Sequence, residues 1–292
     1  MAKDQTLVKL EALKNLAPQL RSSADGEPLQ TYLRDRSNSV VARAATLAGE
    51  IAAKSLAADL LTACERMFRD PVKSDPQCLA KIALVKALRD LDWEEPAIFF
   101  RGARHIQMEP VWGGQVDAAI DLRATSGHAL TSCAGARIHE VFLTLVDLLA
   151  DPAPRVRAEA ALAIGRFEHE QSELLLRLKI RTGDEAPEVM GACFDALLNA
   201  APANSLPLLE PFLDDDELAF EAAAALGASR LNQAFELLLR RISDGDARAE
   251  SLLRALLPKR PYPEFRTRIA EAVAAHGGGA LKRIFAQEFA LD

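Results

Sequence analysis

Apolar residues recur at four-residue steps in the segment DPAPRVRAEAALAIG, which runs from Asp151 to Gly165. Such steps place them on one narrow stripe of a helix, made of Val156, Ala160 and Ile164. The opening Asp is suited to cap free N–H groups, the following Pro fits a first turn, and we expect Gly165 to end the helix. A short helix of this kind buries its stripe only when copies of the same unit stack on either side of it.

Looser copies of this segment follow one another about every 31 to 40 residues, and each copy predicts a pair of helices. The first copy matches at identical internal spacing through Asp35, Val40, Ala44, Ala45 and Gly49. The stripes of other copies are assigned to Ala80, Leu84 and Leu88, to Val116, Ile120 and Ala124, to Val189, Cys193 and Leu197, and to Leu218, Ala222 and Leu226. The pattern predicts a single repeat solenoid over residues 1–292, with an N-terminal cap and first helix (1–34), repeats (35–257) and a C-terminal capping hairpin (258–292).

Two repeats depart from this regular pattern. In the third repeat a helix is expected from Pro96 to about Ile106, followed by a linker over residues 107–114 that is longer than the linkers elsewhere. In the sixth repeat Pro207 and Pro211 lie in or beside the first helix. An interior Pro costs a helix about 3 kcal/mol, so we expect this helix to be short or kinked.

The unit resembles the HEAT repeat, in the short variant named after the phycobilisome lyases. The residues that carry the resemblance are Asp151, Pro152, Val156, Arg157, Ala160, Ala161 and Gly165. The resemblance implies an all-α, right-handed superhelix of about seven or eight helical hairpins. It also implies bonds from the Asp and the Arg to their counterparts in adjacent repeats. That ladder is expected to be incomplete here, because the counterparts of Arg157 are Val41, Lys81, Asp117, Met190 and Ala219.

The amino-acid composition supports the prediction of helices and disfavours nucleic acid and membranes as partners. Aromatic residues make up only 5% of the chain while Ala and Leu are abundant, which favours helix over sheet. The net charge of −7 opposes binding to nucleic acid. The first residues lack the apolar core of a signal peptide and no apolar run is long enough for a membrane span, so a cytoplasmic protein is expected. The four cysteines are separated widely and are interpreted as small apolar residues in a reducing compartment.

Three families built from similar repeats suggest chemistry that can be compared with this sequence. Deoxyhypusine hydroxylases hold two irons with His-Glu pairs in second helices, but His139-Glu140 and His169-Glu170 lie at or before first helices. The HEAT-like alkylpurine DNA glycosylases bind DNA in a basic concave groove. Here the expected concave position, that of Leu162, is matched by Thr46, Lys86, Leu122, Asp195 and Ala224, which form no row of cations. No residue set selects the tetrapyrrole on which a phycobilisome lyase acts. The sequence therefore predicts no catalytic residue, no cofactor and no metal site.

The segment from Asp92 to Gly114 stands apart because it holds both tryptophans of the chain. Long loops in regular repeat arrays often carry specific contacts, and Trp and Arg are frequent at the centres of interfaces. One interpretation is a partner-binding loop around Trp112. The other is that Trp93, Phe99 and Phe100 fill the core while Trp112 closes the junction between repeats. The residues predicted to bind a partner are Arg101, Arg104, His105, Glu109, Trp112, Leu122, Leu162 and Asp195.

The resulting functional hypothesis is a non-enzymatic scaffold that presents an extended concave surface to a protein partner. Neither nucleic acid nor a membrane is the expected partner. The alternative is a lyase-like accessory protein acting on a prosthetic group, or a HEAT-like enzyme that binds or repairs nucleic acid. The repeat motif decides the fold and says little about function, because function is carried by sites added to the fold.

Overall fold

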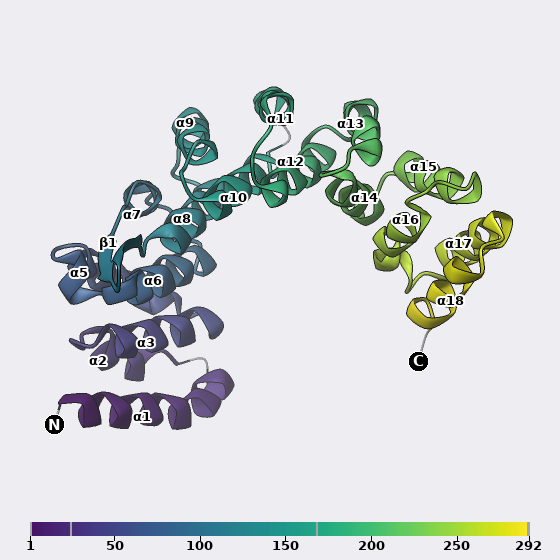
Figure 1. Cartoon of the computed structure of the whole chain (residues 1–292). Helices are drawn as coiled ribbons and strands as arrows, with labels where there is room; N and C mark the ends of the chain where they lie inside the picture. The colour runs from purple at the N-terminus through teal and green to yellow at the C-terminus, as the bar shows by residue number, and fades with distance from the viewer. Residues whose placement is uncertain (1, 24, 168, 291–292) are drawn as a thin grey trace. The chain divides into compact units, whose positions relative to one another are not determined.

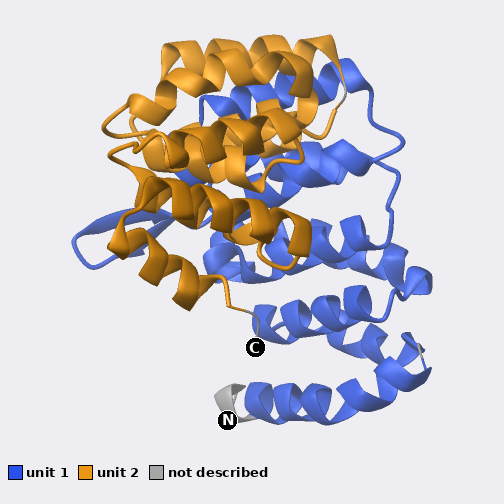
Figure 2. Ribbon diagram, turned by 90° about the vertical axis from the view of Figure 1, so that its right-hand side faces the viewer, with its two compact units in different colours: residues 1–160 blue, residues 161–292 orange. Residues whose placement is uncertain are grey.

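The computed structural model describes residues 2–23, 25–167 and 169–290, and these are organised as helices apart from one short pair of strands (Figure 1). The fold is therefore all-α, as the sequence predicts. Contacts divide the chain into two compact units, residues 1–160 and 161–292 (Figure 2). That both units continue one solenoid stays a prediction. Within the described residues, every helix falls short of the length and apolar character that crossing a bilayer would require.

Unit 1 holds the elements from α1 to α9. Its α-helices are α1 (Ala2–Ser23), α2 (Gln30–Leu33), α3 (Asn38–Glu50), α4 (Ala57–Met67), α5 (Pro71–Ser74), α6 (Leu79–Asp90), α7 (Ala97–Ala103), α8 (Ile120–Ser132) and α9 (Ile138–Leu149). Its 3-10 turns are η1 (Glu27–Leu29), η2 (Lys54–Leu56) and η3 (Pro76–Cys78). The strands β1 (Met108–Val111) and β2 (Gly114–Asp117) lie between α7 and α8 in the chain.

Helix α10 (Pro154–Ile164) contains the boundary between the units, and the helices after it belong to unit 2. The α-helices of unit 2 are α11 (Glu170–Thr182), α12 (Pro187–Ala200), α13 (Pro202–Leu209), α14 (Ala219–Ala228), α15 (Asn232–Ser243), α16 (Ala249–Ala255), α17 (Pro263–His276) and α18 (Gly279–Glu288). Its 3-10 turns are η4 (Glu210–Asp214) and η5 (Leu257–Lys259).

Within each unit, a helix packs on the equivalent helix of the next repeat. In unit 1, α3 packs on α6 and α6 on α8, while α4 packs on α6 and α7 on α8. In unit 2, α12 packs on α14, α14 on α16 and α16 on α18. The second helices thus form a shared row that the first helices cover. This is the arrangement that stacked helical hairpins need in order to bury their apolar stripes.

The stripe that defines the repeat is buried as predicted. Val156, Ala160 and Ile164 are at most 2% exposed. Gly165 follows the last residue of α10, and its main contribution is close packing. A Cβ atom built on Gly165 would lie 2.6 Å from the Cα atom of Ala196 in α12. Any larger residue there would have to push the backbone of α12 away.

The stripe assigned to the third repeat is wrong by six residues. Val116 lies in β2 and is about half exposed, and α8 begins only after it. Asp117 and Arg123 have the same spacing as Asp151 and Arg157, and they are the structural equivalents of that pair. The true stripe of α8 consists of Leu122, Ser126 and Leu130, which are at most 2% exposed.

Both irregular repeats differ from the regular hairpin in the expected places. In the third repeat the first helix, α7, is shorter than predicted, and residues 108–117 form a β-hairpin where a loop was expected. In the sixth repeat the prediction of a short first helix is confirmed. Helix α13 contains Pro207 and gives way at Glu210 to the 3-10 turn η4, which contains Pro211.

Candidate interaction site at the β-hairpin

Strands β1 and β2 pair in an antiparallel hairpin with Trp112 and Gly113 as its two-residue turn. The register runs from Met108 opposite Asp117 to the closing pair beside the turn. Gly113 has φ of +88°, in the left-handed region that favours glycine. The Trp112-Gly113 sequence therefore allows a tight turn that holds the Trp side chain at the end of the hairpin.

Backbone and side-chain bonds fix the base of the hairpin to helix α8. The N–H of Ala118 donates to the carbonyl oxygen of Gln107 at 2.9 Å, which continues the ladder beyond the strands. The carboxylate of Asp117 accepts the N–H of Gln107 at 3.1 Å and the N–H of Ala119 at 2.9 Å. The same carboxylate thus ends the hairpin and starts the helix that follows it.

Arg123 joins the hairpin base to the next repeat. Its guanidinium donates to the Asp117 carboxylate at 2.6 Å, to the Asp151 carboxylate at 2.7 and 3.0 Å, and to the carbonyl oxygen of His105 at 3.0 Å. Burial by itself raises the pKa of Asp117, but the N–H of Ala119 and the Arg123 guanidinium outweigh it and hold that pKa below its usual range. This is a rung of the Asp–Arg ladder that the resemblance implies.

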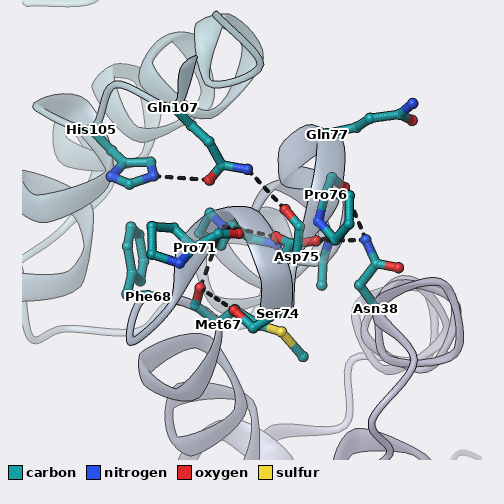
Figure 3. Close-up of polar contacts among 12 residues, drawn as sticks. Asn38, Met67, Phe68, Pro71, Ser74, Asp75, Pro76, Gln77, His105 and Gln107 are labelled. Carbon is teal, nitrogen blue, oxygen red and sulfur yellow. Dashed lines mark hydrogen bonds and ion pairs between the residues drawn. The ribbon is translucent and has the colours of Figure 1, made fainter. Parts of the chain in front are cut away.

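A fully buried ion pair lies near the hairpin, between the carboxylate of Asp75 and the ammonium of Lys81 at 3.2 Å. Asp75 also accepts two backbone N–H groups at the start of α6, both at 2.8 Å, and the amide of Asn38 at 2.9 Å. The Lys81 ammonium reaches the carbonyl oxygens of Met67 and Pro71 at 3.4 Å (Figure 3). Because both charges are paired and hydrogen-bonded, their burial is tolerated.

Gln107 and Glu109 connect this buried pair to the hairpin. Figure 3 shows the Gln107 side chain directed at Asp75. The Gln107 amide donates to the carbonyl oxygen of Asp75 at 2.9 Å and to the Glu109 carboxylate at 2.6 Å. That carboxylate also accepts the N–H of Gln77 at 2.6 Å. Gln77 and Cys78 have φ of 61° and 54°, a costly conformation for residues other than glycine. Glu109 therefore holds a strained turn against the hairpin and fixes β1 on the body of unit 1.

The end of the hairpin is apolar and open to solvent. Trp112 is fully exposed, at 103% of its reference area, and Val111 and Val116 are 45% and 48% exposed. Met108 at the other end of β1 is also exposed by 45%. Trp112 therefore does not close a junction between repeats, and that part of the second interpretation is wrong. Phe99, which the same interpretation placed in the core, is fully buried. A firmly anchored arm that presents a bare Trp is typical of a contact surface.

The basic residues predicted beside Trp112 lie on α7 or just after it. The Arg101 guanidinium stacks over the Phe68 ring at 4.3 Å, and the Arg104 guanidinium lies 5.5 Å from the centre of the Phe100 ring. The side chains of Arg101 and Arg104 are both exposed to solvent. The His105 ring packs edge-on against the same Phe68 ring, at 5.0 Å between ring centres.

The His105 side chain contacts another residue of the site and is partly buried. Its Nε2 atom lies 3.2 Å from the Gln107 side-chain oxygen. Burial lowers the pKa of His105, and the bond to Gln107 only partly offsets that effect. A neutral imidazole that positions Gln107 fits this environment.

The other predicted binding residues lie elsewhere. Leu122 is completely buried because it occupies the stripe of α8, so its prediction as a partner contact is wrong. Leu162 and Asp195 belong to unit 2 and are partly exposed. Burial raises the pKa of Asp195, and among the described residues no ion pair reaches its carboxylate.

Three residues that organise the site were not predicted from sequence as site residues: Gln107, Asp117 and Arg123. Asp117 and Arg123 carry a readable signal, since their six-residue separation repeats that of Asp75 and Lys81. Gln107 carries none. Its role depends on a hairpin that places it over the carbonyl oxygen of Asp75.

The cysteine thiols are buried within the helical layers. Burial raises the pKa of Cys64, Cys78 and Cys193 to about 12, so these thiols stay protonated at neutral pH. A protonated thiol is a poor nucleophile and a poor metal ligand. The interpretation of these cysteines as small apolar residues fits their places in the core.

Residues 142–228 match the family model for HEAT repeats. The matched stretch begins in α9 and ends at the last residue of α14. This part of the chain is therefore similar to HEAT repeats, which agrees with the general resemblance read from Asp151 to Gly165. The short variant named after the phycobilisome lyases stays a prediction. A search of curated proteins found no match.

Proposed function

We propose that this protein is a non-enzymatic scaffold that binds a protein partner through the β-hairpin of its third repeat. The observation that carries the proposal is the full exposure of Trp112 at the end of a hairpin whose base is tied to buried charges. HEAT repeats stack into extended surfaces suited to such binding, and the second helices of this chain are proposed to form a concave one.

Anchoring at the base supports recognition because it reduces the entropy lost on binding. The Gln107, Glu109 and Arg123 bonds hold the hairpin before any partner arrives. A rigid aromatic side chain then contributes its apolar area without first ordering a loop. The exposed Arg101 and Arg104 on α7 are proposed to lie at the rim of the same contact.

The Trp112→Ala variant tests this function. Trp at the centre of an interface commonly contributes 2 kcal/mol or more, so partner capture should weaken by about tenfold or more. Helical content and melting temperature should stay within error of the parent, since the Trp112 side chain is fully exposed. Proteins captured from a cell extract would be compared by quantitative mass spectrometry.

A matched control is Tyr262→Ala, which removes an exposed aromatic side chain from unit 2. It should leave the captured set unchanged. Equal capture by the Trp112→Ala variant and the parent would contradict a binding role for the hairpin. A melting temperature lowered by many degrees would instead show that Trp112 supports the fold.

A further inference from the structure

Pro110 determines which backbone groups of the hairpin point outward. In an antiparallel pair, residues that exchange ladder bonds alternate with residues whose N–H and C=O groups point away from the partner strand. Pro110 has no N–H and pairs with Gln115, so this pair is of the second kind. The Ala118 N–H donates to the carbonyl oxygen of Gln107, so that pair is of the first, ladder-bonded kind. Pro110 is three positions from Gln107, and because the two kinds of pair alternate, an odd number of steps places Pro110 in a pair of the other kind.

The two edges of the hairpin are therefore unequal. On β1 the outward N–H at position 110 is missing, so that edge is poorly suited to receive another strand. On β2 Gln115 directs both its N–H and its C=O outward, and Asp117 does the same by the same alternation. No hydrogen bond from the described part of the chain reaches the outward backbone groups of Gln115.

Space around this edge is open. Gln115 and Val116 are exposed, and a Cβ atom built on Gly113 or Gly114 would meet nothing within 4 Å. An unpaired edge with free donors and acceptors is matched by an extended backbone, which pairs through alternate N–H and C=O groups. Val116 adds an exposed apolar side chain next to which an apolar residue of a paired strand could pack.

The negative charge of the hairpin favours an added strand that carries positive charge. Residues 106–122 contain Glu109, Asp117 and Asp121 but no Lys, Arg or His. Arg123 pairs with Asp117 and Arg155 pairs with Asp121, each at 2.6 Å, so among the described residues Glu109 is the carboxylate of this segment that has no cation beside it. The carboxylate of Glu109 is held only by neutral N–H donors. A second copy of this chain would bring the same carboxylates, at a net charge of −7 per copy, whereas a basic segment is complementary.

We propose that an extended, basic segment of the protein partner adds to the free edge of β2 as a third strand, beside Trp112. This inference rests on the proposed function and specifies its partner. The strand pairs with the outward groups of Gln115 and Asp117, its apolar residues alternate beside Val116, and its Lys or Arg residues lie near Glu109. Trp112 packs over the end of the added strand.

The matched variants are Gln115→Pro and Gln115→Ala. The Pro variant removes one outward donor that the hairpin ladder does not use, and so copies on β2 what Pro110 does on β1. The Ala variant keeps that donor and removes only the side chain. Slow hydrogen exchange at the Val116 amide, which the ladder does use, would show that the hairpin persists in both full-length variants.

The probe is the peptide KVTVTVTK, compared with the same peptide N-methylated at alternate residues and with EVTVTVTE. Binding is followed by the amide resonances and hydrogen exchange of Gln115 and Asp117. We expect KVTVTVTK to protect both amides in the parent and the Ala variant. The Pro variant, the N-methylated peptide and the acidic peptide should each bind about tenfold more weakly, as expected for lost backbone bonds or reversed charge.

Several outcomes would overturn the strand addition. These are equal binding of the N-methylated peptide by the parent protein, unchanged binding by the Pro variant, or no protection of Gln115 at saturating peptide. Sedimentation of the parent as a dimer and of the Pro variant as a monomer would assign the edge to a second copy instead. If Trp112→Ala still weakens partner capture in these cases, the proposed function stands and only the strand addition fails.

Discussion

At the scale of single residues, the position of Ala160 is enclosed in repeat after repeat. Its equivalents are at most 2% exposed in all six repeats compared: Ala44, Leu84, Ser126, Ala160, Cys193 and Ala222. Ser126 is the only one with a polar oxygen, and its hydroxyl has no hydrogen-bond partner among the described residues. A Cβ atom on Gly102 would lie 2.2 Å from that oxygen, so α7 passes directly over it.

We predict that Ser126→Ala leaves the protein as stable as the parent or makes it more stable by up to about 1 kcal/mol. Removing a buried hydroxyl without a partner relieves its desolvation cost, and Ala fits the space that Ser fills. The measurement is the free energy of unfolding from urea titration.

The control is Thr144→Val in α9, at a residue that is 1% exposed. The Thr144 hydroxyl donates to the carbonyl oxygen of Glu140 at 3.1 Å and accepts from Arg104 at 3.4 Å. Its loss should destabilise the protein by about 1 kcal/mol. If Ser126→Ala were the more damaging variant, the Ser126 hydroxyl must have a structural role that its contacts do not show.

At the scale of elements, the third repeat shows what the sequence pattern could and could not predict. The helices of most repeats could be predicted from their apolar stripes. Ala and Leu at four-residue steps are all buried together in only one helical register. In the third repeat Val116, Ile120 and Ala124 also form such a stripe, so apolar spacing alone allowed the wrong register. The six-residue spacing from Asp117 to Arg123 resolves the choice, since an Arg on the buried edge needs a carboxylate within reach.

The β-hairpin could not be predicted from the pattern of apolar residues. The segment from Met108 to Asp117 contains Pro110 and two adjacent glycines, which favour a loop when read alone. Its strands form because Glu109 finds a partner in η3 and Gln107 finds one in Asp75 just before η3, both distant in the chain. The prediction that Trp112 contacts a partner needed only its place in an unusually long connection, and that contact stays a proposal. The structural roles of His105 and Glu109 could be recognised only from the folded structure.

Helices α12 and α14 bring together carboxylates that form no ion pair with the described part of the chain. Burial raises the pKa of Asp195, and burial together with Glu188 and Asp195 raises the pKa of Glu221. A carboxyl group whose pKa is higher in the folded state opposes folding at neutral pH and ceases to do so once it is protonated. Protonation of Asp195 and Glu221 therefore removes a cost to folding as the pH falls.

We predict that Asp195→Asn raises the melting temperature at pH 7, by less than the equivalent of about 1 kcal/mol. The gain should shrink as the pH falls through the raised pKa of Asp195 and vanish below its usual value of 3.8, where Asp is neutral in both states. Thermal melts across this pH range provide the measurement.

Asp184→Asn is the matched control in the same unit. Its carboxylate is 3% exposed and lies 2.7 Å from the Lys179 ammonium. Removing that charge should destabilise the protein at pH 7 and not stabilise it. A gain from Asp195→Asn that persisted unchanged at pH 3 would argue against a charge effect at Asp195.

At the scale of the whole molecule, stability is distributed along the chain because helices pack mainly on their neighbours in sequence. In unit 1 the central second helix α6 contacts α3 and α8, and in unit 2 α14 contacts α12 and α16. In such arrays the cost of a defect falls chiefly on the repeat that contains it and on those beside it. The stability of each hairpin therefore depends on its own packing and on the repeats beside it.

This locality predicts the effect of Leu84→Ala in α6, where the Leu side chain is fully buried. The cavity should cost about 2–5 kcal/mol. Amides of α3, α6 and α8 should exchange faster, while those of α14, α16 and α18 keep their protection, as measured by hydrogen exchange with mass spectrometry. Leu7→Ala, at an exposed residue of α1, should change neither set. Faster exchange spread evenly over all these helices would mean that the chain unfolds as one cooperative body, and the nearest-neighbour account of its stability would fail.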